Sequence, residues 1–274
     1  MVPTGHCGKE FVKLNTEWLS QLNDQTPFEG IAMKVLMFLP NLLLQKPSAK
    51  SKAKEHNKLL TDRLKLWNEG EFDEIWKEGL TIQKKLSSSQ KKPRTNEDIS
   101  RVFSKLMMEG KVGAALKFLE EQSENAVLQP TEEIIVKLRA LHPTANDIQP
   151  NTLINGPIEE TSGATFYSID EQQIFKAANR TKGSGGPSLL DAQQWKRLLC
   201  SNKFNAESKD LRVELAKFAR RIATEPIDPH ALEAYTAVRL IPLNKSPGEE
   251  EIKVRPIGVG EVIGIGHQQK LPPG

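Results

Sequence analysis

Basic side chains at Lys245, Lys253 and Arg255 could together bind a phosphate. They belong to two short segments, 237–243 and 252–259, which are rich in β-branched and aliphatic residues and are separated by a Ser-Pro-Gly turn. This pattern predicts a β-hairpin, in which alternation places Lys253 and Arg255 on one face. A guanidinium forms bidentate, charge-assisted hydrogen bonds with phosphate, and a lysine adds a point charge. The hairpin therefore indicates a phosphate site, with merely solvated basic residues as the alternative.

The hairpin also constrains what must surround it. Pro242 and Pro256 have no N–H to donate to a β-ladder, so each is expected at a sheet edge or a strand end. A two-stranded unit is only marginally stable by itself. We therefore expect the fold to need more strands than this chain offers.

The first half of the chain has the spacing of short helices joined in pairs. Leu60, Leu64 and Trp67 lie on one helical face, and Gly70 is a suitable end for that helix. Thr95 and Thr131 each precede acidic residues and an apolar periodic segment, which is typical of a helix start. The pattern predicts helical hairpins but has no fixed-period repeat.

The second half of the chain predicts further helices before the hairpin. Ser168 and Ser188 each stand three residues before an acidic residue, in the spacing of a capping box. Trp195 would then lie on the apolar face of the second helix. A longer helix follows, whose apolar stripe contains Leu211, Leu215, Phe218 and Ile222. Its basic residues indicate a solvated face more readily than a nucleic-acid contact.

Residues 144–163 are rich in Pro, Gly, Asn and Thr and predict a linker. The chain then divides into a helical region at 1–143, the linker at 144–163 and a third region at 164–274. The expected fold class is mainly α, with a C-terminal β-hairpin.

Two lysine-rich patches offer a second mode of phosphate binding. Clustered cations release counterions from a nucleic-acid backbone, so RNA or DNA is the expected partner, with solvated loops as the alternative. Neither patch has aromatic residues between its lysines, so base stacking is not predicted for them. The candidate contact residues are Lys46, Lys50, Lys52, Lys54, Lys91, Lys92 and Arg94.

Composition excludes several other classes of function. The net charge is +3, from 38 basic and 35 acidic residues, so nucleic-acid binding would require clustering of charge. Two cysteines are too few for a disulfide framework and favour a reducing, intracellular compartment without distinguishing nucleus from cytoplasm. The longest apolar stretch, 35–44, is too short for a membrane span and is expected to be broken by Pro40.

A zinc site is also not expected. His6 and Cys7 resemble part of a Cys/His finger, but no cysteine partner or closely spaced histidine pair stands at the required distance. No metal or cofactor is therefore predicted for this chain.

The order of several segments resembles retrotransposon reverse transcriptases. The string RLIPLNK followed by VRPIGVGEV is similar to the first motifs of the polymerase fingers, and an upstream GPS-x-LDA-x-x-W string is similar to the turn and helix that precede them. Residues 31–86 and 99–143 also resemble the region before the polymerase. The resemblance implies that Arg255 contacts the triphosphate of an incoming nucleotide and that Lys245 lines the same pocket. Leu189 stands where the family has glycine, a position that favours positive φ.

The resemblance also implies what a complete enzyme needs. Reverse transcription is two-metal phosphoryl transfer, in which carboxylates hold two Mg²⁺ ions, and those carboxylates follow the hairpin in the family. The chain reaches Gly274 without them, so we expect an incomplete fingers subdomain and no polymerase activity by this chain alone, with a nucleoside triphosphate as partner only of a complete enzyme. The alternatives are a helical module that binds RNA or protein without catalysis, and a relic without function.

Overall fold

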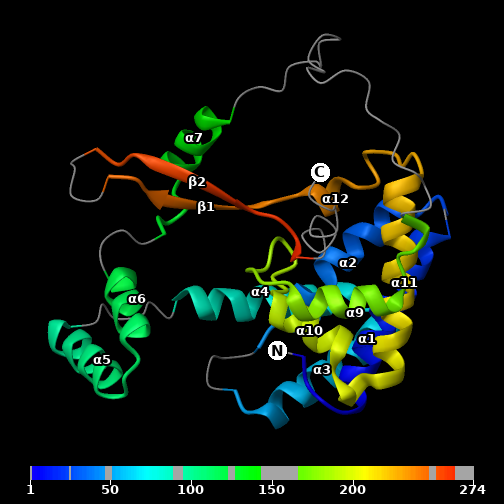
Figure 1. Ribbon diagram of the computed structural model, residues 1–274, viewed down its shortest axis with the longest axis horizontal. Coiled ribbons are helices and arrows are strands. Elements are labelled where there is room, and N and C mark those ends of the chain that lie inside the picture. Colours follow the sequence, from blue (N-terminus) through cyan, green and yellow to red (C-terminus); the bar gives the residue numbers. More distant parts are fainter. Residues whose placement is uncertain are drawn as a thin grey trace. The chain divides into compact units, whose positions relative to one another are not determined.

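The computed structural model describes most of the chain as helices and a single pair of strands (Figure 1), covering residues 2–24, 26–46, 51–88, 95–122, 127–142, 166–246 and 251–262. The chain divides into two compact units. Unit 1 comprises Met1–Ser88, Glu159–Arg239 and Val259–Gly274, and unit 2 comprises Ser89–Ile158 and Leu240–Gly258. Each unit is therefore assembled from segments that are distant in sequence. The expected linker at 144–163 lies outside the described residues.

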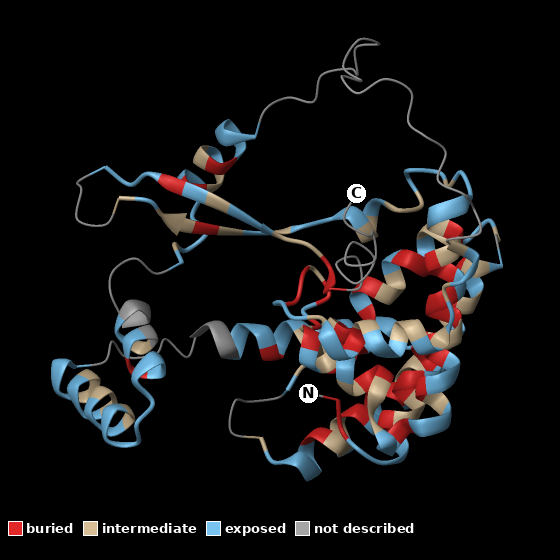
Figure 2. Ribbon diagram, in the orientation of Figure 1, coloured by how far each residue is buried: buried red, intermediate tan, exposed pale blue. Residues whose placement is uncertain are grey.

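Unit 1 is a helical assembly around one apolar core. Helices α1 and α11 pack along each other, and α2 lies against α1 (Figure 1). Buried residues concentrate on the faces where these helices meet (Figure 2). The described elements of this unit are α1 (His6–Asn23), α2 (Glu29–Leu43), α3 (Ala53–Glu69), α4 (Phe72–Ser88), α9 (Glu171–Arg180), α10 (Ala192–Cys200), the 3₁₀ helix η2 (Asn202–Phe204), α11 (Asn205–Thr224) and α12 (Glu233–Thr236).

Several helix boundaries agree with the sequence patterns. Helix α3 ends at Gly70, whose φ of 81° is the left-handed conformation that glycine adopts at low cost. The hydroxyl of Thr95 accepts a hydrogen bond from the backbone N–H of Asp98 at 3.2 Å and opens α5 (Asn96–Met108). Thr131 opens α7 (Glu132–Leu141) in the same way. The capping residues in the sequence thus predict these helix boundaries correctly.

Three local predictions are wrong. Pro40 lies inside α2, which continues to Leu43, so the proline does not break that helix. Helix α9 is capped by Asp170 and not by Ser168. Helix α10 is capped by Asp191, whose carboxylate accepts from Gln194 N–H at 2.8 Å. In the last two cases an aspartate nearer the helix supplies the acceptor in place of the serine.

The basic residues of α11 are not simply solvated. Arg212 is buried, donates to the carbonyl of Leu199 at 2.5 Å and pairs with Glu171. Arg221 is buried as well and donates to the carbonyl of Leu22. These guanidiniums satisfy backbone acceptors at the ends of α10 and α1, which no intrahelical N–H can reach. Their role is helix capping, a use that the sequence analysis did not consider.

Unit 2 contains two separate groups of elements. Helices α5 and α6 (Val112–Gln122) form a pair, with Gly110 at a φ of 71° between them. Helix α7 packs on the hairpin of β1 (Arg239–Asn244) and β2 (Val254–Val259), most of which belongs to this unit. The mainly helical fold with a C-terminal β-hairpin is thus confirmed.

The hairpin is stabilised by a helix and a bridge. The N–H of Lys245 donates to the carbonyl of Lys253 at 2.7 Å, which fixes the antiparallel register. On the outer edge of β1, the carbonyl of Pro242 accepts from Leu128 N–H at 2.8 Å. Because the described sheet has two strands, Pro242 and Pro256 both lie on edge strands, as expected. The described residues contain no strand besides these two, as expected, and α7 supplies apolar cover for the hairpin.

Within the described residues, no helix combines the length and the apolar content required to cross a lipid bilayer.

Candidate nucleic-acid interface

The phosphate-site candidates on the hairpin are exposed to solvent. Arg255, Lys253 and Lys245 all have exposed side chains, whereas Val254 between two of them is buried. Alternation along β2 is thus as predicted, with the basic residues on the open face. The 245–253 backbone bond brings Lys245 and Lys253 directly opposite each other at the turn end of the ladder. Both are therefore neighbours of Arg255 in the same hairpin.

Packing on the opposite face holds β2 in position. Val254 contacts a small apolar cluster with Ile134 and Leu138 of α7, and Leu128 covers its edge. The ammonium of Lys137 donates to the carbonyl of Ile252 at 3.3 Å. A strand fixed in this way presents Arg255 from a supported backbone and not from a free loop.

The residues after β2 are fixed by a buried contact within unit 1. The carboxylate of Glu261 accepts from the Ser188 N–H at 2.5 Å and from the Ser188 hydroxyl at 2.7 Å. Both residues are buried. Gly186 lies so close to Gly260 that a Cβ atom on it would be 2.6 Å from the Gly260 carbonyl carbon. This contact joins the two glycine-containing motifs that the sequence analysis treated separately, and Glu261 and Ser188 were not identified as partners.

The loop that contains Gly186 and Ser188 also accepts a hydrogen bond from a residue of β1. Arg239 at the start of β1 donates to the carbonyl of Gly185 at 3.0 Å. Leu189 has a φ of 59° and is the one described non-glycine residue with positive φ. The suspicion that a leucine here must adopt a conformation suited to glycine is therefore correct.

The structure describes only some residues of the two lysine-rich patches. Lys46 is exposed beyond the end of α2, and Lys52 and Lys54 are exposed at the start of α3, where the Lys52 N–H donates to Glu55 at 3.0 Å. The candidates Lys50, Lys91, Lys92 and Arg94 lie outside the described residues. The structure thus supplies exposed cations near α3 but no geometry for the second patch.

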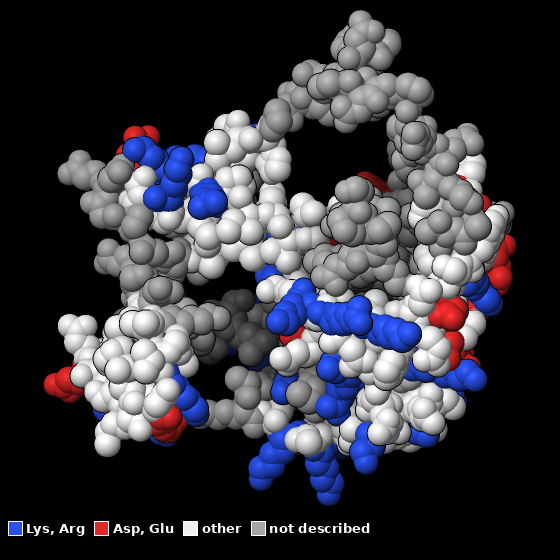
Figure 3. Space-filling view, in the orientation of Figure 1, with Lys and Arg blue, Asp and Glu red and all other residues white. Residues whose placement is uncertain are grey.

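A basic surface that the sequence analysis did not identify covers α9 and α10. Figure 3 shows a row of basic side chains across this face. Its exposed cations form no ion pair with any described residue, and they are Lys176, Arg180, Lys182 and Lys196. The acidic residues of segment 171–204 are Glu171, which pairs with Arg212, and Asp191, which caps α10. We call these four cations the α9–α10 basic face. They come from α9, from the segment after it and from α10, and the two helices pack against each other.

Nucleophile and metal chemistry find little support in the described residues. Burial raises the pKa of the Cys200 thiol, while Arg212 and Lys196 oppose that shift, so the thiol is not activated. Cys7 is a buried free thiol in α1. No group of three or more His, Cys, Asp or Glu side chains in the described part of the chain could hold a metal ion.

A scan against protein-family models, a search of curated proteins and a search of solved structures each find no match to this chain. The chemistry open to the molecule therefore follows from its residues. Exposed cations without carboxylate partners are suited to binding the phosphates of a polyanion.

Proposed function

We propose that this chain is the helical arm and fingers region of a retroelement reverse transcriptase, and that its own activity is binding nucleic acid through the phosphates. The order of the fingers-like segments supports the first part, with Arg255 as the contact to a nucleotide triphosphate. The single observation that carries the second part is the α9–α10 basic face, whose four cations lack ion partners among the described residues.

The physical basis is the release of counterions from the nucleic-acid backbone. A cation already paired with a carboxylate gains little from a phosphate, whereas an unpaired one contributes fully. Binding to single strands should weaken with salt, with a slope of about −0.7 in log affinity against log salt for each phosphate contacted. Contacts from the α9–α10 basic face thus predict a slope of about −2 to −3.

The test replaces three cations of this face. The triple variant Lys176→Glu, Arg180→Glu and Lys196→Glu should bind a labelled 20-nucleotide RNA at least about tenfold more weakly than the parent, with a shallower salt slope. Fluorescence anisotropy over a salt series measures both quantities. The matched control is Lys13→Glu, Lys34→Glu and Lys65→Glu, which changes the net charge equally at exposed lysines already paired with Glu10, Glu233 and Glu69. An equal loss in both triple variants would contradict a specific role for this face.

Arg255 has a separate test. Removing a hydrogen-bonding guanidinium from a charged ligand costs about 1.5–3 kcal/mol. In a chain restored to the full-length enzyme, Arg255→Ala should therefore weaken the binding of a nucleoside triphosphate by that amount, measured by calorimetry. Arg101→Ala is the control, because Arg101 is exposed but paired with Asp98. An unchanged triphosphate affinity in Arg255→Ala would remove Arg255 from the site.

Catalysis is tested directly. The chain is proposed to bind nucleic acid without extending it, so a primed RNA template with Mg²⁺ and deoxynucleotides should yield no product. Primer extension by this chain alone, dependent on Mg²⁺, would contradict that proposal.

A further inference from the structure

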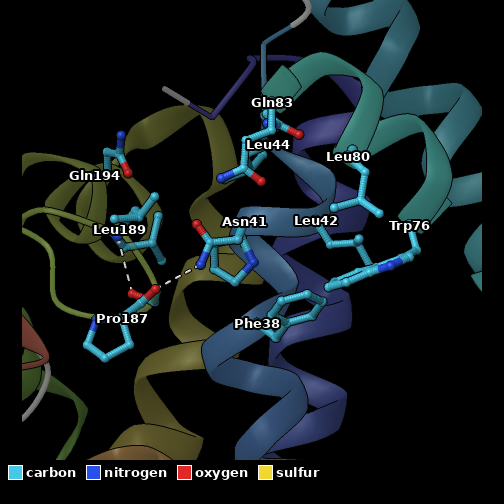
Figure 4. Close-up of a pocket in the computed structure, with 15 residues that line it drawn as sticks. Phe38, Asn41, Leu42, Leu44, Trp76, Leu80, Gln83, Pro187, Leu189 and Gln194 are labelled. Carbon is cyan, nitrogen blue, oxygen red and sulfur yellow. Dashed lines mark hydrogen bonds between the residues drawn. The ribbon is translucent and has the colours of Figure 1, made fainter. Parts of the chain in front are cut away.

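An open groove lies in unit 1 between the end of α2, the middle of α4 and the loop that leads into α10 (Figure 4). Its volume is about 430 Å³. That is within the range of sites that hold small ligands, roughly 300–1,000 Å³. The groove is separate from the α9–α10 basic face, because none of the four cations of that face lines it.

Two aromatic rings form one wall of the groove. Phe38 of α2 and Trp76 of α4 have ring centroids 5.4 Å apart. Both remain exposed, at 43% and 46% of their surfaces. Leu189, exposed at 53%, belongs to the opposite wall (Figure 4). Large apolar side chains that face one another across a hollow and remain exposed indicate a surface that another molecule covers.

Amide side chains supply the polar part of the lining. Asn41 donates from its Nδ2 to the carbonyl of Pro187 at 2.8 Å, which fixes its orientation across the groove (Figure 4). The side chains of Gln83 and Gln194 form no hydrogen bond with any described residue. None of the described residues that line the groove is acidic or basic. Amides both donate and accept, so this lining suits an uncharged ring whose edge carries donors and acceptors.

Two lysines are next in sequence to residues of this uncharged lining. Lys46 follows the lining residue Gln45, and Lys84 follows Gln83. Both lysines are exposed and form no ion pair with a described residue. Lysines next in sequence to the lining and aromatic rings within it correspond to the two parts of a single-stranded nucleic acid, its phosphates and its bases. The aromatic residues missing from the lysine-rich sequence around Lys46 are thus supplied by α2 and α4.

We propose that this groove binds an unpaired base of a single-stranded nucleic acid, stacked against Trp76 and Phe38. The inference rests on nucleic acid being the ligand, but it uses residues distinct from the α9–α10 basic face and from Arg255. An unpaired base offers both of its faces to aromatic side chains and its edge to the amides of the groove. A base inside a duplex offers neither, so the groove distinguishes single strands from double strands.

The experiment measures anisotropy of a labelled octamer of uridylate with the full chain, its Trp76→Ala variant and its Trp76→Phe variant. Trp76→Ala should weaken binding about 10- to 100-fold, the range for loss of one stacking contact, and Trp76→Phe should retain most of the affinity. Phe28→Ala is the matched control, because Phe28 is an exposed aromatic residue next to α2 that does not line the groove. Circular dichroism of each variant verifies that it is folded.

A duplex RNA of the same length separates this inference from the proposed function. Trp76→Ala should leave duplex affinity unchanged, whereas the triple charge reversal on the α9–α10 basic face should weaken both ligands. If Trp76→Ala binds the octamer as the parent does, the groove inference fails while phosphate binding stands. If only Trp76→Ala weakens the octamer, the groove stands and the basic face fails. If the parent binds neither RNA, both are overturned.

Discussion

Leu189 is the residue at which sequence and backbone conflict most directly. It holds a φ of 59°, a conformation that costs a residue with a Cβ about 1–2 kcal/mol. The conformation persists because the surrounding loop determines it. The N–H of Leu189 donates to the carbonyl of Gly186, and the adjacent Ser188 is bound by Glu261. The buried contact between Ser188 and Glu261 therefore determines the geometry of the loop, and a preference of Leu189 does not.

Replacing this leucine should relieve the conflict. Leu189→Gly removes the Cβ, and the side chain is 53% exposed, so little apolar burial is lost. After the greater chain entropy of glycine is subtracted, we expect a gain of up to about 1 kcal/mol in the free energy of unfolding. Leu189→Ile should lose stability, because a β-branched residue tolerates positive φ still less. Urea unfolding of the two variants provides the comparison, and a more stable Leu189→Ile would refute it.

Gly186 should not tolerate any side chain. A Cβ at this position would lie 2.6 Å from the carbonyl carbon of Gly260, and backbone cannot move aside as a flexible side chain can. Gly186→Ala is therefore expected to cost about 1–3 kcal/mol of unfolding free energy. Gly30→Ala is the control, because its nearest atom is 3.7 Å away and α2 gains helix propensity. Equal stability of the two alanine variants would contradict the close approach of these backbones.

At the scale of elements, the carboxyl end of α2 depends on one buried side chain. Arg63 of α3 is completely buried, and its Nη1 donates to the carbonyls of Leu43 at 3.0 Å and Gln45 at 2.7 Å. Its Nε pairs with Glu78 of α4. One guanidinium thus joins the end of α2 to the middle of α3 and the middle of α4.

Removing that guanidinium should destabilise unit 1. Arg63→Met keeps much of the apolar stem but leaves two carbonyls without a donor, so we expect a loss of about 3 kcal/mol in chemical denaturation. Lys65→Met is the control, because Lys65 is exposed and pairs with Glu69 at 3.8 Å, and it should change stability by less than about 0.5 kcal/mol. A similarly small loss of stability in both variants would show that the carbonyls of Leu43 and Gln45 find other donors.

His56 acts at the same helix end and makes it sensitive to pH. Its Nε2 lies 3.2 Å from the carbonyl of Leu44, and burial lowers the pKa of the imidazole from 6.5. The unfolded chain therefore binds more protons below about pH 6.5, so stability should fall as the pH drops through 6.5 towards the folded pKa. Denaturation midpoints at pH 7.5 and 5.5 measure this loss. The loss of stability should be smaller in His56→Gln. An equal loss in the variant and the parent would show that His56 is not the source of the pH dependence.

Much of the local structure can be predicted from sequence. Most hydrogen bonds between polar residues that are distant in sequence cannot. The caps at Thr95, Thr131 and Gly70 follow from neighbours within one helical turn. The burial of Arg212 depends on a carbonyl thirteen residues away, and Glu261 meets Ser188 across 73 residues. No short-range pattern contains such partners. The aromatic pair of the groove was not predicted for the same reason, since Phe38 and Trp76 come from two different helices, α2 and α4.

At the scale of the whole molecule, stability is distributed unevenly. Helices α1 and α11 contribute many buried residues to the core of unit 1, including Phe11, Leu22, Leu211 and Phe218 (Figure 2). Helix α5 contains no buried residue, and Met108 at its end is 90% exposed. Local opening requires little free energy where few apolar contacts are broken. The two units should therefore open separately.

Hydrogen exchange measured by mass spectrometry tests that expectation. Backbone amides of α1 and α11 should exchange most slowly and those of α5 fastest among the described helices. Leu215→Ala removes buried apolar volume from the core of unit 1 and should accelerate exchange in α1 and α11 without changing α7. Val254→Ala is the reciprocal variant, because Val254 packs on Ile134 and Leu138, and it should accelerate exchange in α7 alone. If either substitution accelerated exchange in both sets of helices equally, the chain would unfold as one cooperative unit, and the separation of its stability into two parts would be wrong.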